Sequence, residues 1–205
     1  MIHQDIHFDT PHTRTIHSAV EALEKGGSII YPTDTVYGIG CSIYRKSAIE
    51  RLYKIKGKSK FDPMSLICNS IQQAAEYAQI SNTVFRILKR CFPGPYTVVL
   101  PAKHGIAKLM LSRQKEIGIR IPDSPVCQML VEGLGHPLLN TSVNVFFDED
   151  WFDEGEDTEK FLDFAEIFLD AGPLPESRES TVVKIHDHEI EILREGKGDP
   201  EVLFY

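Results

Sequence analysis

The segment Tyr31–Gly40, with the sequence YPTDTVYGIG, brings together side chains that bind small ligands. Two threonine hydroxyls, a carboxylate and a tyrosine hydroxyl lie within one short stretch. The segment follows the apolar run 28–30 and leads toward a predicted helix, which is typical of a loop at the carboxyl end of a buried strand, where α/β proteins place ligand sites. Gly38 and Gly40 would give such a loop its backbone freedom. A plain polar turn has the same composition, so the segment alone leaves a structural role equally open.

Charge is unevenly distributed along a chain whose formal net charge is -8. Seven lysines and arginines lie between Arg45 and Lys60 against the single Glu50, whereas eight acids and no base lie between Asp148 and Glu159. The net charge argues against a general nucleic-acid coat. The basic stretch indicates a local site for the phosphates of a nucleotide or of RNA, with a solvated helix face as the alternative. We predict that residues 145–160 form an acidic insertion or lid loop.

Composition favours one globular domain, which we place at residues 13–200 of the 205. No apolar run approaches the roughly 20 residues that span a membrane. The four cysteines are scattered without a CxxC pair, so we interpret them as core residues of a cytoplasmic protein. His186 and His188 fit a hairpin turn better than a metal site, and we predict no metal ligands.

Periodicity and turn signals alternate along the chain and predict an α/β layer fold. One helix would be capped by Thr10 with Pro11 in its first turn, and another by a capping box of Ser47 and Glu50, ending near residue 57. Further helices are predicted at 70–78, 82–91, 106–111 and 125–134. Strands are predicted at 28–31, 65–68, 96–100, 117–121, 138–140, 167–169, 181–185 and 190–193.

Common nucleotide-binding signatures are absent. The segment ending in Gly57-Lys58-Ser59 has Leu52 where a P-loop has its first glycine, and no GxGxxG is present. Instead, seven short motifs follow one another in a specific order: YPTDTVYGIG, IKGKSKFDPMSL, FPGPYTVVLPA, GIRIPDSP, a TSxN element at 141–144, STVV and LREG. From about Val20 to Gly198 this series resembles the YrdC domain of the threonylcarbamoyl-AMP synthase family.

The resemblance implies a twisted, mostly mixed or parallel sheet, flanked by helices, with a positively charged cavity. It also implies a nucleotidyltransferase that forms threonylcarbamoyl-adenylate from L-threonine, bicarbonate and ATP and releases pyrophosphate. The product would pass to the tRNA threonylcarbamoyl transfer machinery. ATP is then a substrate, with Mg²⁺ bridging its phosphates.

Carried over by motif, the resemblance implies a role for each of ten residues. Threonine would be bound by Thr35, Tyr37, Arg120 and Ser180, with Arg120 on its carboxylate. Catalysis near the phosphates would fall to Lys56, Lys58, Ser142 and Asn144. ATP would be bound by Lys56, Lys58, Asp62, Ser142 and Arg194. Arg120 could instead form a buried ion pair, and Tyr37 could be a core aromatic with a bonded hydroxyl.

Four positions depart from the synthase pattern and resemble the YciO-like branch of the family. Lys58 replaces an arginine and loses its planar fork, and Asp62 places a negative charge near the phosphates. Ile67 replaces a histidine, and Val143 replaces an alanine. These changes motivate a second hypothesis, in which the protein is a module that binds double-stranded RNA, tRNA or a nucleotide without efficient synthase activity. A carbamoyl-adenylating domain of the hydrogenase-maturation type ranks below both.

Overall fold

The computed structural model describes residues 1–55, 64–106, 115–143, 163–186 and 189–204. In these residues ten strands form one sheet of order β1-β8-β2-β3-β7-β4-β6-β5-β9-β10. The strands are β1 (Ile2–Asp5), β2 (Ser28–Tyr31), β3 (Gly38–Ser42), β4 (Ser65–Ile67), β5 (Tyr96–Pro101), β6 (Glu116–Arg120), β7 (Leu138–Ser142), β8 (Ile167–Asp170), β9 (Thr181–His186) and β10 (Glu189–Arg194). The helices are α1 (Thr13–Glu24), α2 (Lys46–Ile55), α3 (Ile71–Tyr77), α4 (Asn82–Cys91), α6 (Pro125–Leu134) and the 3₁₀ helix η2 (Pro200–Leu203).

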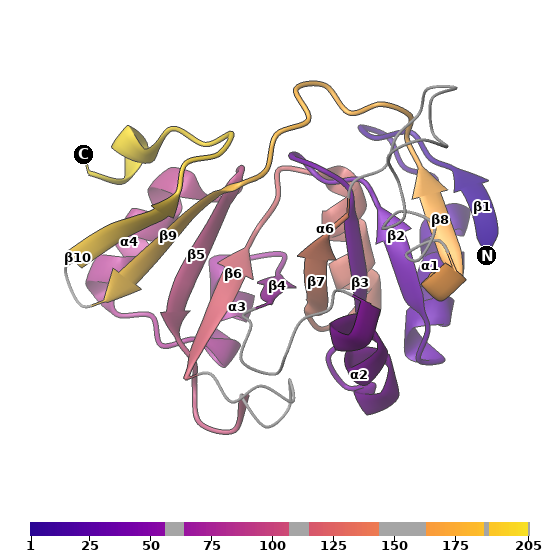
Figure 1. Cartoon of the computed structure of the whole chain (residues 1–205), viewed down its shortest axis with the longest axis horizontal. Helices are drawn as coiled ribbons and strands as arrows, with labels where there is room; N and C mark the ends of the chain where they lie inside the picture. Colours follow the sequence, from indigo (N-terminus) through magenta and orange to yellow (C-terminus); the bar gives the residue numbers. More distant parts are fainter. Residues whose placement is uncertain (56–63, 107–114, 144–162, 187–188, 205) are drawn as a thin grey trace.

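The sheet is mixed and flanked by helices, which confirms the predicted fold class. Strands β1, β8 and β2 run parallel, as do the pairs β4–β6 and β5–β9, while the remaining pairs are antiparallel. The edge strands β1 and β10 place the two chain ends at opposite ends of the sheet (Figure 1). Among the described residues no helix combines the length and apolar character needed to cross a membrane.

Two apolar clusters hold the helices against the sheet. Alternate residues of a strand point to opposite faces, so Ile29 packs with Leu23 of α1 and Leu130 of α6, whereas Ile30 belongs to the cluster that includes Leu52 of α2. All five side chains are at most 1% exposed. Each contributes about 1.5–3 kcal/mol by burial, which holds α1, α2 and α6 against the sheet.

Local capping signals fix the starts of three helices. Ser70, Ser81 and Ser124 each accept a backbone hydrogen bond at the start of α3, α4 and α6. Pro125 follows the Ser124 cap, and Gly135 ends α6 in the left-handed region at φ 72°. The predicted boundaries of α6 at 125 and 134 are thereby confirmed.

The N-terminal helix starts were predicted wrongly. Helix α1 begins at Thr13 after His12, while the Thr10 hydroxyl bonds to His7 instead of capping the helix. Helix α2 begins at Lys46, so Ser47 lies inside its first turn and cannot be its cap. The end of this helix near residue 57, most of the predicted 106–111 helix and the 145–160 insertion fall outside the described residues.

The prediction that residues 31–40 lead into a helix was also wrong, because Gly38–Ser42 forms strand β3 between β2 and β7. None of the positive-φ glycines is Gly38 or Gly40. A Cβ on Gly38 would overlap the Asn140 amide, and one on Gly40 would lie 3.1 Å from the Tyr31 ring. These glycines therefore provide room for neighbouring side chains and not turn conformations. Strand β1 was not predicted because it is mostly exposed and lacks an apolar alternation.

Candidate active site

A cavity of about 280 Å³ opens over the strands β7, β4, β6, β5 and β9. Strand register creates its floor, because Ser65 of β4 pairs with both Asn140 of β7 and Gly118 of β6. A Cβ on Gly118 would lie 3.3 Å from both Ser65 and Thr97, so glycine keeps the floor open. The described lining consists of Val36, Met64, Ser65, Thr97, Val99, Gly118, Arg120, Asn140, Thr141, Ser142, Glu179, Ser180, Val182 and Arg194.

A buried ion pair anchors one wall of the cavity. Nη2 of Arg120 donates to Asp34 Oδ1 at 3.1 Å and to Thr35 Oγ1 at 2.9 Å. The Arg120 and Asp34 side chains are only 5% and 9% exposed. Burial raises the pKa of Asp34 above its ordinary value, and the charge of Arg120 opposes that rise. The buried Nε of Arg120 has no hydrogen-bond partner among the described residues, so the guanidinium retains a donor.

Hydrogen bonds within the loop between β2 and β3, and from two residues outside it, hold this loop in place. Thr33 Oγ1 donates to the carbonyl of Val36 at 2.6 Å and accepts from the amide of Thr35 at 3.1 Å. Asp34 Oδ2 accepts from the amide of Asp123, and Lys197 Nζ donates to the carbonyl of Asp34 at 3.0 Å. The Thr33 hydroxyl thus stabilises the loop that carries Asp34 and Thr35, and both of these residues accept from Arg120.

Polar side chains from three strand ends also meet in the lining of the cavity. Glu179 Oε2 accepts from Nη1 of Arg194 at 2.5 Å, and Glu179 Oε1 lies 3.5 Å from the donating hydroxyl of Ser142. Arg194 also donates through Nε and Nη2 to the carbonyl of Ser180 at 3.3 and 3.0 Å. The hydroxyls of Ser180 and Thr97 are 2.8 Å apart. This group of side chains contains charged and hydroxyl donors suited to an anion.

A buried tyrosine orients an amide at the cavity floor. Tyr31 is fully buried and donates its hydroxyl to Asn140 Oδ1 at 2.6 Å. Burial raises the pKa of Tyr31 well above its ordinary value, so the hydroxyl remains a donor. Because Oδ1 of Asn140 is engaged in this way, the NH₂ end of the amide is the one offered to a ligand.

The structure brings together four of the residues assigned from the sequence. Arg120, Ser142, Ser180 and Arg194 line one cavity, and Thr35 lies directly against Arg120. Tyr37 is not in this lining; its hydroxyl donates to the carbonyl of Gly172 at 2.8 Å and accepts from the amide of Ala171 at 2.9 Å. The remaining assigned residues lie outside the described part of the chain: Lys56, Lys58, Asp62 and Asn144. All of these roles stay predictions.

Among the polar residues that were not assigned from the sequence, Asp34, Asn140 and Glu179 make the contacts that shape the site. Asp34 lies in the recognised segment, but only the fold shows that it reaches Arg120. Asn140 lies two residues before Ser142, and the period of a strand places both on one face, which is a signal that could have been used. Glu179 directly precedes the STVV motif, yet nothing local indicates its contact with Arg194.

Comparison with known proteins settles the family. A family model described as telomere recombination, which covers the Sua5, YciO and YrdC proteins, matches residues 21–196. The chain belongs to the Sua5/YciO/YrdC family. An uncharacterised protein YciO of Escherichia coli is 35% identical over 199 residues, with 95% of each chain covered. A putative threonylcarbamoyl-AMP synthase of Methanocaldococcus jannaschii is 32% identical over 181 residues, covering 86% of this chain and 85% of that protein.

Solved structures of the Sua5/YciO/YrdC family share the fold. The crystal structure of E. coli YciO aligns with a TM-score of 0.84 at 32% identity and covers 99% of this chain and 100% of that chain. P. abyssi Sua5 complexed with L-threonine aligns with a TM-score of 0.82 at 24% identity and covers 96% of this chain and 58% of that chain. The YrdC-type fold and the likeness to YciO, both expected from the motifs, are confirmed.

The basic stretch behind the RNA hypothesis is only partly described. Lys46 lies 3.9 Å from Glu50, and Arg51 lies 3.6 Å from Glu166 and donates to the carbonyl of Gly26. These described cations of α2 therefore have partners within the protein. RNA binding by this stretch stays a prediction.

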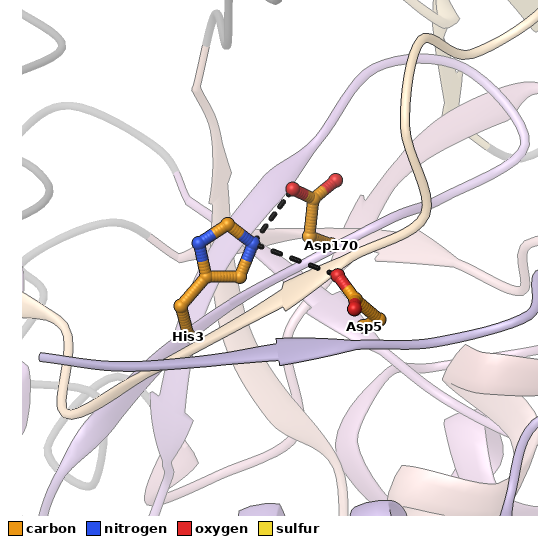
Figure 2. A group of neighbouring side chains, drawn as sticks. All are labelled: His3, Asp5 and Asp170. Atoms are coloured by element: carbon orange, nitrogen blue, oxygen red, sulfur yellow. Dashed lines mark hydrogen bonds and ion pairs between the residues drawn. The ribbon is translucent and has the colours of Figure 1, made fainter.

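Two further features lie away from this cavity. Figure 2 shows His3 of β1, whose Nε2 is 2.7 Å from Asp170 Oδ2 and 4.0 Å from Asp5 Oδ1. Asp5 is fully exposed, and the His3–Asp170 contact connects the edge strand β1 to β8.

A larger cavity of about 520 Å³ lies between α3, α4 and α6, and it contains none of the residues assigned from the sequence.

Proposed function

We propose that this protein condenses L-threonine, bicarbonate and ATP into threonylcarbamoyl-adenylate, for the modification of tRNA. The observation that carries the proposal is the state of Arg120 in the cavity. Its Nη2 is fixed by Asp34 and Thr35, while its buried Nε has no partner in the described chain. A buried guanidinium with a remaining donor is suited to a carboxylate ligand, and threonine supplies one.

The reaction needs orientation and charge neutralisation more than a reactive side chain. The amino group of threonine and bicarbonate form a carbamate and water. A carbamate oxygen then bonds to the α-phosphorus of ATP, the bond from that phosphorus to the bridging oxygen breaks, and pyrophosphate leaves. Positioning and electrostatic stabilisation can supply most of such a rate enhancement. Mg²⁺ bound with ATP would reduce the charge on its phosphates.

Several polar groups of the described lining have a role in this reaction. Arg120 would hold the threonine carboxylate at one end, with Ser180 and Thr97 near the threonine. Ser142 and the Asn140 NH₂ would donate to phosphate oxygens without adding charge, and Arg194 would contribute a cation. The predicted contributions of the lysines at 56 and 58 and of Asn144 complete this set.

Relatives support the same chemistry. The M. jannaschii relative is named as a putative threonylcarbamoyl-AMP synthase, and the P. abyssi structure is titled as a complex with L-threonine. The uncharacterised YciO of E. coli covers nearly the whole chain. We extend the synthase activity to this chain because Arg120, Ser142 and Arg194 meet in one cavity. The departures Lys58, Asp62, Ile67 and Val143 would lower its rate.

Pyrophosphate release tests the proposal. Purified protein with ATP and Mg²⁺ should release pyrophosphate only when both L-threonine and bicarbonate are present. Mixtures lacking either one, and mixtures with serine or valine in place of threonine, serve as controls. Release that is independent of threonine, or its absence in the complete mixture, would contradict the proposed function.

A further inference from the structure

We propose that Glu179 is the protein ligand of the divalent cation that accompanies ATP, and that without nucleotide its carboxylate takes the place of phosphate on Ser142 and Arg194. This inference rests on the proposed function, because it concerns the nucleotide of the same cavity. It adds a metal-binding role to a residue that no sequence motif singled out.

The contacts of Glu179 are those that a phosphate would make. Its two oxygens face the Ser142 hydroxyl at 3.5 Å and Arg194 Nη1 at 2.5 Å. These two residues are the ones assigned to ATP on the described wall of the cavity. One carboxylate therefore contacts both anion-binding groups.

The side chain of Glu179 can move while its backbone is held. Its carbonyl accepts from the amide of Lys197 at 2.8 Å, and Arg194 remains bonded to the carbonyl of Ser180 through Nε and Nη2. The Glu179 and Arg194 side chains are 47% and 42% exposed. Rotation of the carboxylate toward solvent would free Nη1 of Arg194 and leave the rest of the arginine in position.

Charge then determines what the carboxylate does when ATP arrives. Glu179 is the only acidic side chain in the described lining, beside the cations Arg120 and Arg194. A carboxylate at hydrogen-bonding distance from bound phosphates repels them. Mg²⁺ removes this repulsion, since it is commonly bound by one or two carboxylates together with substrate phosphates. Glu179 would thereby favour metal-loaded ATP over the free nucleotide.

An ordinary surface ion pair is the competing explanation. Exposed pairs contribute little to stability, and one between Glu179 and Arg194 would only compete with the nucleotide. The two explanations differ in one measurable respect. A competitor weakens ATP binding equally with and without metal, whereas a metal ligand makes ATP binding depend on the metal.

Calorimetric titration with ATP, in the absence of threonine and bicarbonate, separates these cases. Wild type, Glu179→Gln and Glu179→Asp are each titrated in Mg²⁺ and in EDTA. Glu195→Gln is the matched control, because it removes one exposed negative charge beside Arg194 without touching Ser142. Urea unfolding of each variant establishes that it is folded.

For the wild type we expect Mg²⁺ to tighten ATP binding by about tenfold or more. Glu179→Gln should bind ATP about 3–10-fold more tightly than wild type in EDTA, because a like charge is removed, and should lose most of the gain from Mg²⁺. Glu179→Asp should retain part of that gain, and Glu195→Gln should behave as wild type. Electron paramagnetic resonance of Mn²⁺ with ATP should show the same loss of metal contact in Glu179→Gln.

An unchanged ratio of affinities in Mg²⁺ and EDTA for Glu179→Gln would overturn the inference and leave the proposed function intact. If Glu179→Gln binds ATP more tightly than wild type by the same factor in Mg²⁺ and in EDTA, the inference is also overturned, because Glu179 then only competes with the nucleotide. Failure of the wild type to bind ATP in either buffer would overturn both the inference and the proposed function.

Discussion

Replacing Arg120 by lysine separates the structural role of this residue from its role in binding substrate. Lysine retains a positive charge for Asp34, which has a 9% exposed side chain. It has no counterpart of the Nε donor, and a single ammonium cannot reproduce the planar fork. The variant should therefore fold but bind threonine poorly.

The size of each effect follows from the contacts. Losing one or two charge-assisted hydrogen bonds to a carboxylate, at about 1.5–3 kcal/mol each, corresponds to an affinity for L-threonine that is lower by at least roughly tenfold. Because Nη2 of Arg120 donates to both Asp34 and Thr35, unfolding should become easier by about 1–2 kcal/mol. Arg120→Met leaves Asp34 buried without its cation and should cost about 3–5 kcal/mol.

Titration of L-threonine, with L-threoninol as the matched ligand that lacks a carboxylate, gives the direct assay. Wild type should prefer threonine over threoninol, and Arg120→Lys should lose most of that preference. Urea unfolding of the same samples gives the change in stability. A lysine variant that binds threonine within threefold of wild type and still discriminates against threoninol would refute the assignment of Arg120.

Three further predictions concern buried groups around the site. Tyr31→Phe leaves Asn140 Oδ1 without its donor, so the free energy of unfolding should fall by about 1–3 kcal/mol and the affinity for ATP should decrease. A variant with the stability of wild type in urea and the ATP affinity of wild type by calorimetry would contradict the orienting role of Tyr31. Tyr37→Phe removes the hydrogen bonds to Ala171 and Gly172. It should lower the free energy of unfolding by about 1–3 kcal/mol and leave the affinity for threonine near that of wild type. A loss of threonine affinity without a loss of stability would instead indicate that Tyr37 contacts the substrate. Burial raises the pKa of three of the four buried cysteine thiols to about 12. The native protein at pH 8 should therefore resist Ellman's reagent and react only after denaturation. Fast reaction of the folded protein would contradict this prediction.

Much of the fold could be predicted because its signals are local. Apolar periodicity and turn signals identified α3, α4 and α6, and apolar runs identified the central strands. Strand β3 was missed because its residues Gly38–Ser42 are small and gain their role only between β2 and β7. The edge strand β1 was missed because pairing with β8, and not its own pattern of burial, defines it.

The site was predictable only in part, for a similar reason. Arg120, Ser142, Ser180 and Arg194 could be named because they lie in ordered motifs. That Asp34 fixes Arg120, or that Glu179 contacts both Ser142 and Arg194, depends on contacts between residues 15–86 positions apart in the sequence. Such distant pairs follow from the order of the strands in the sheet, which no single segment encodes.

Detection of the product itself tests the central claim most directly. The protein is incubated with ATP, L-threonine and ¹³C-labelled bicarbonate, and the mixture is analysed at once by mass spectrometry. The proposed function predicts an adduct that contains AMP, threonine and one labelled carbon, formed together with pyrophosphate. Unchanged ATP, or release of AMP and pyrophosphate without a labelled adduct when trapping is prompt, would contradict it.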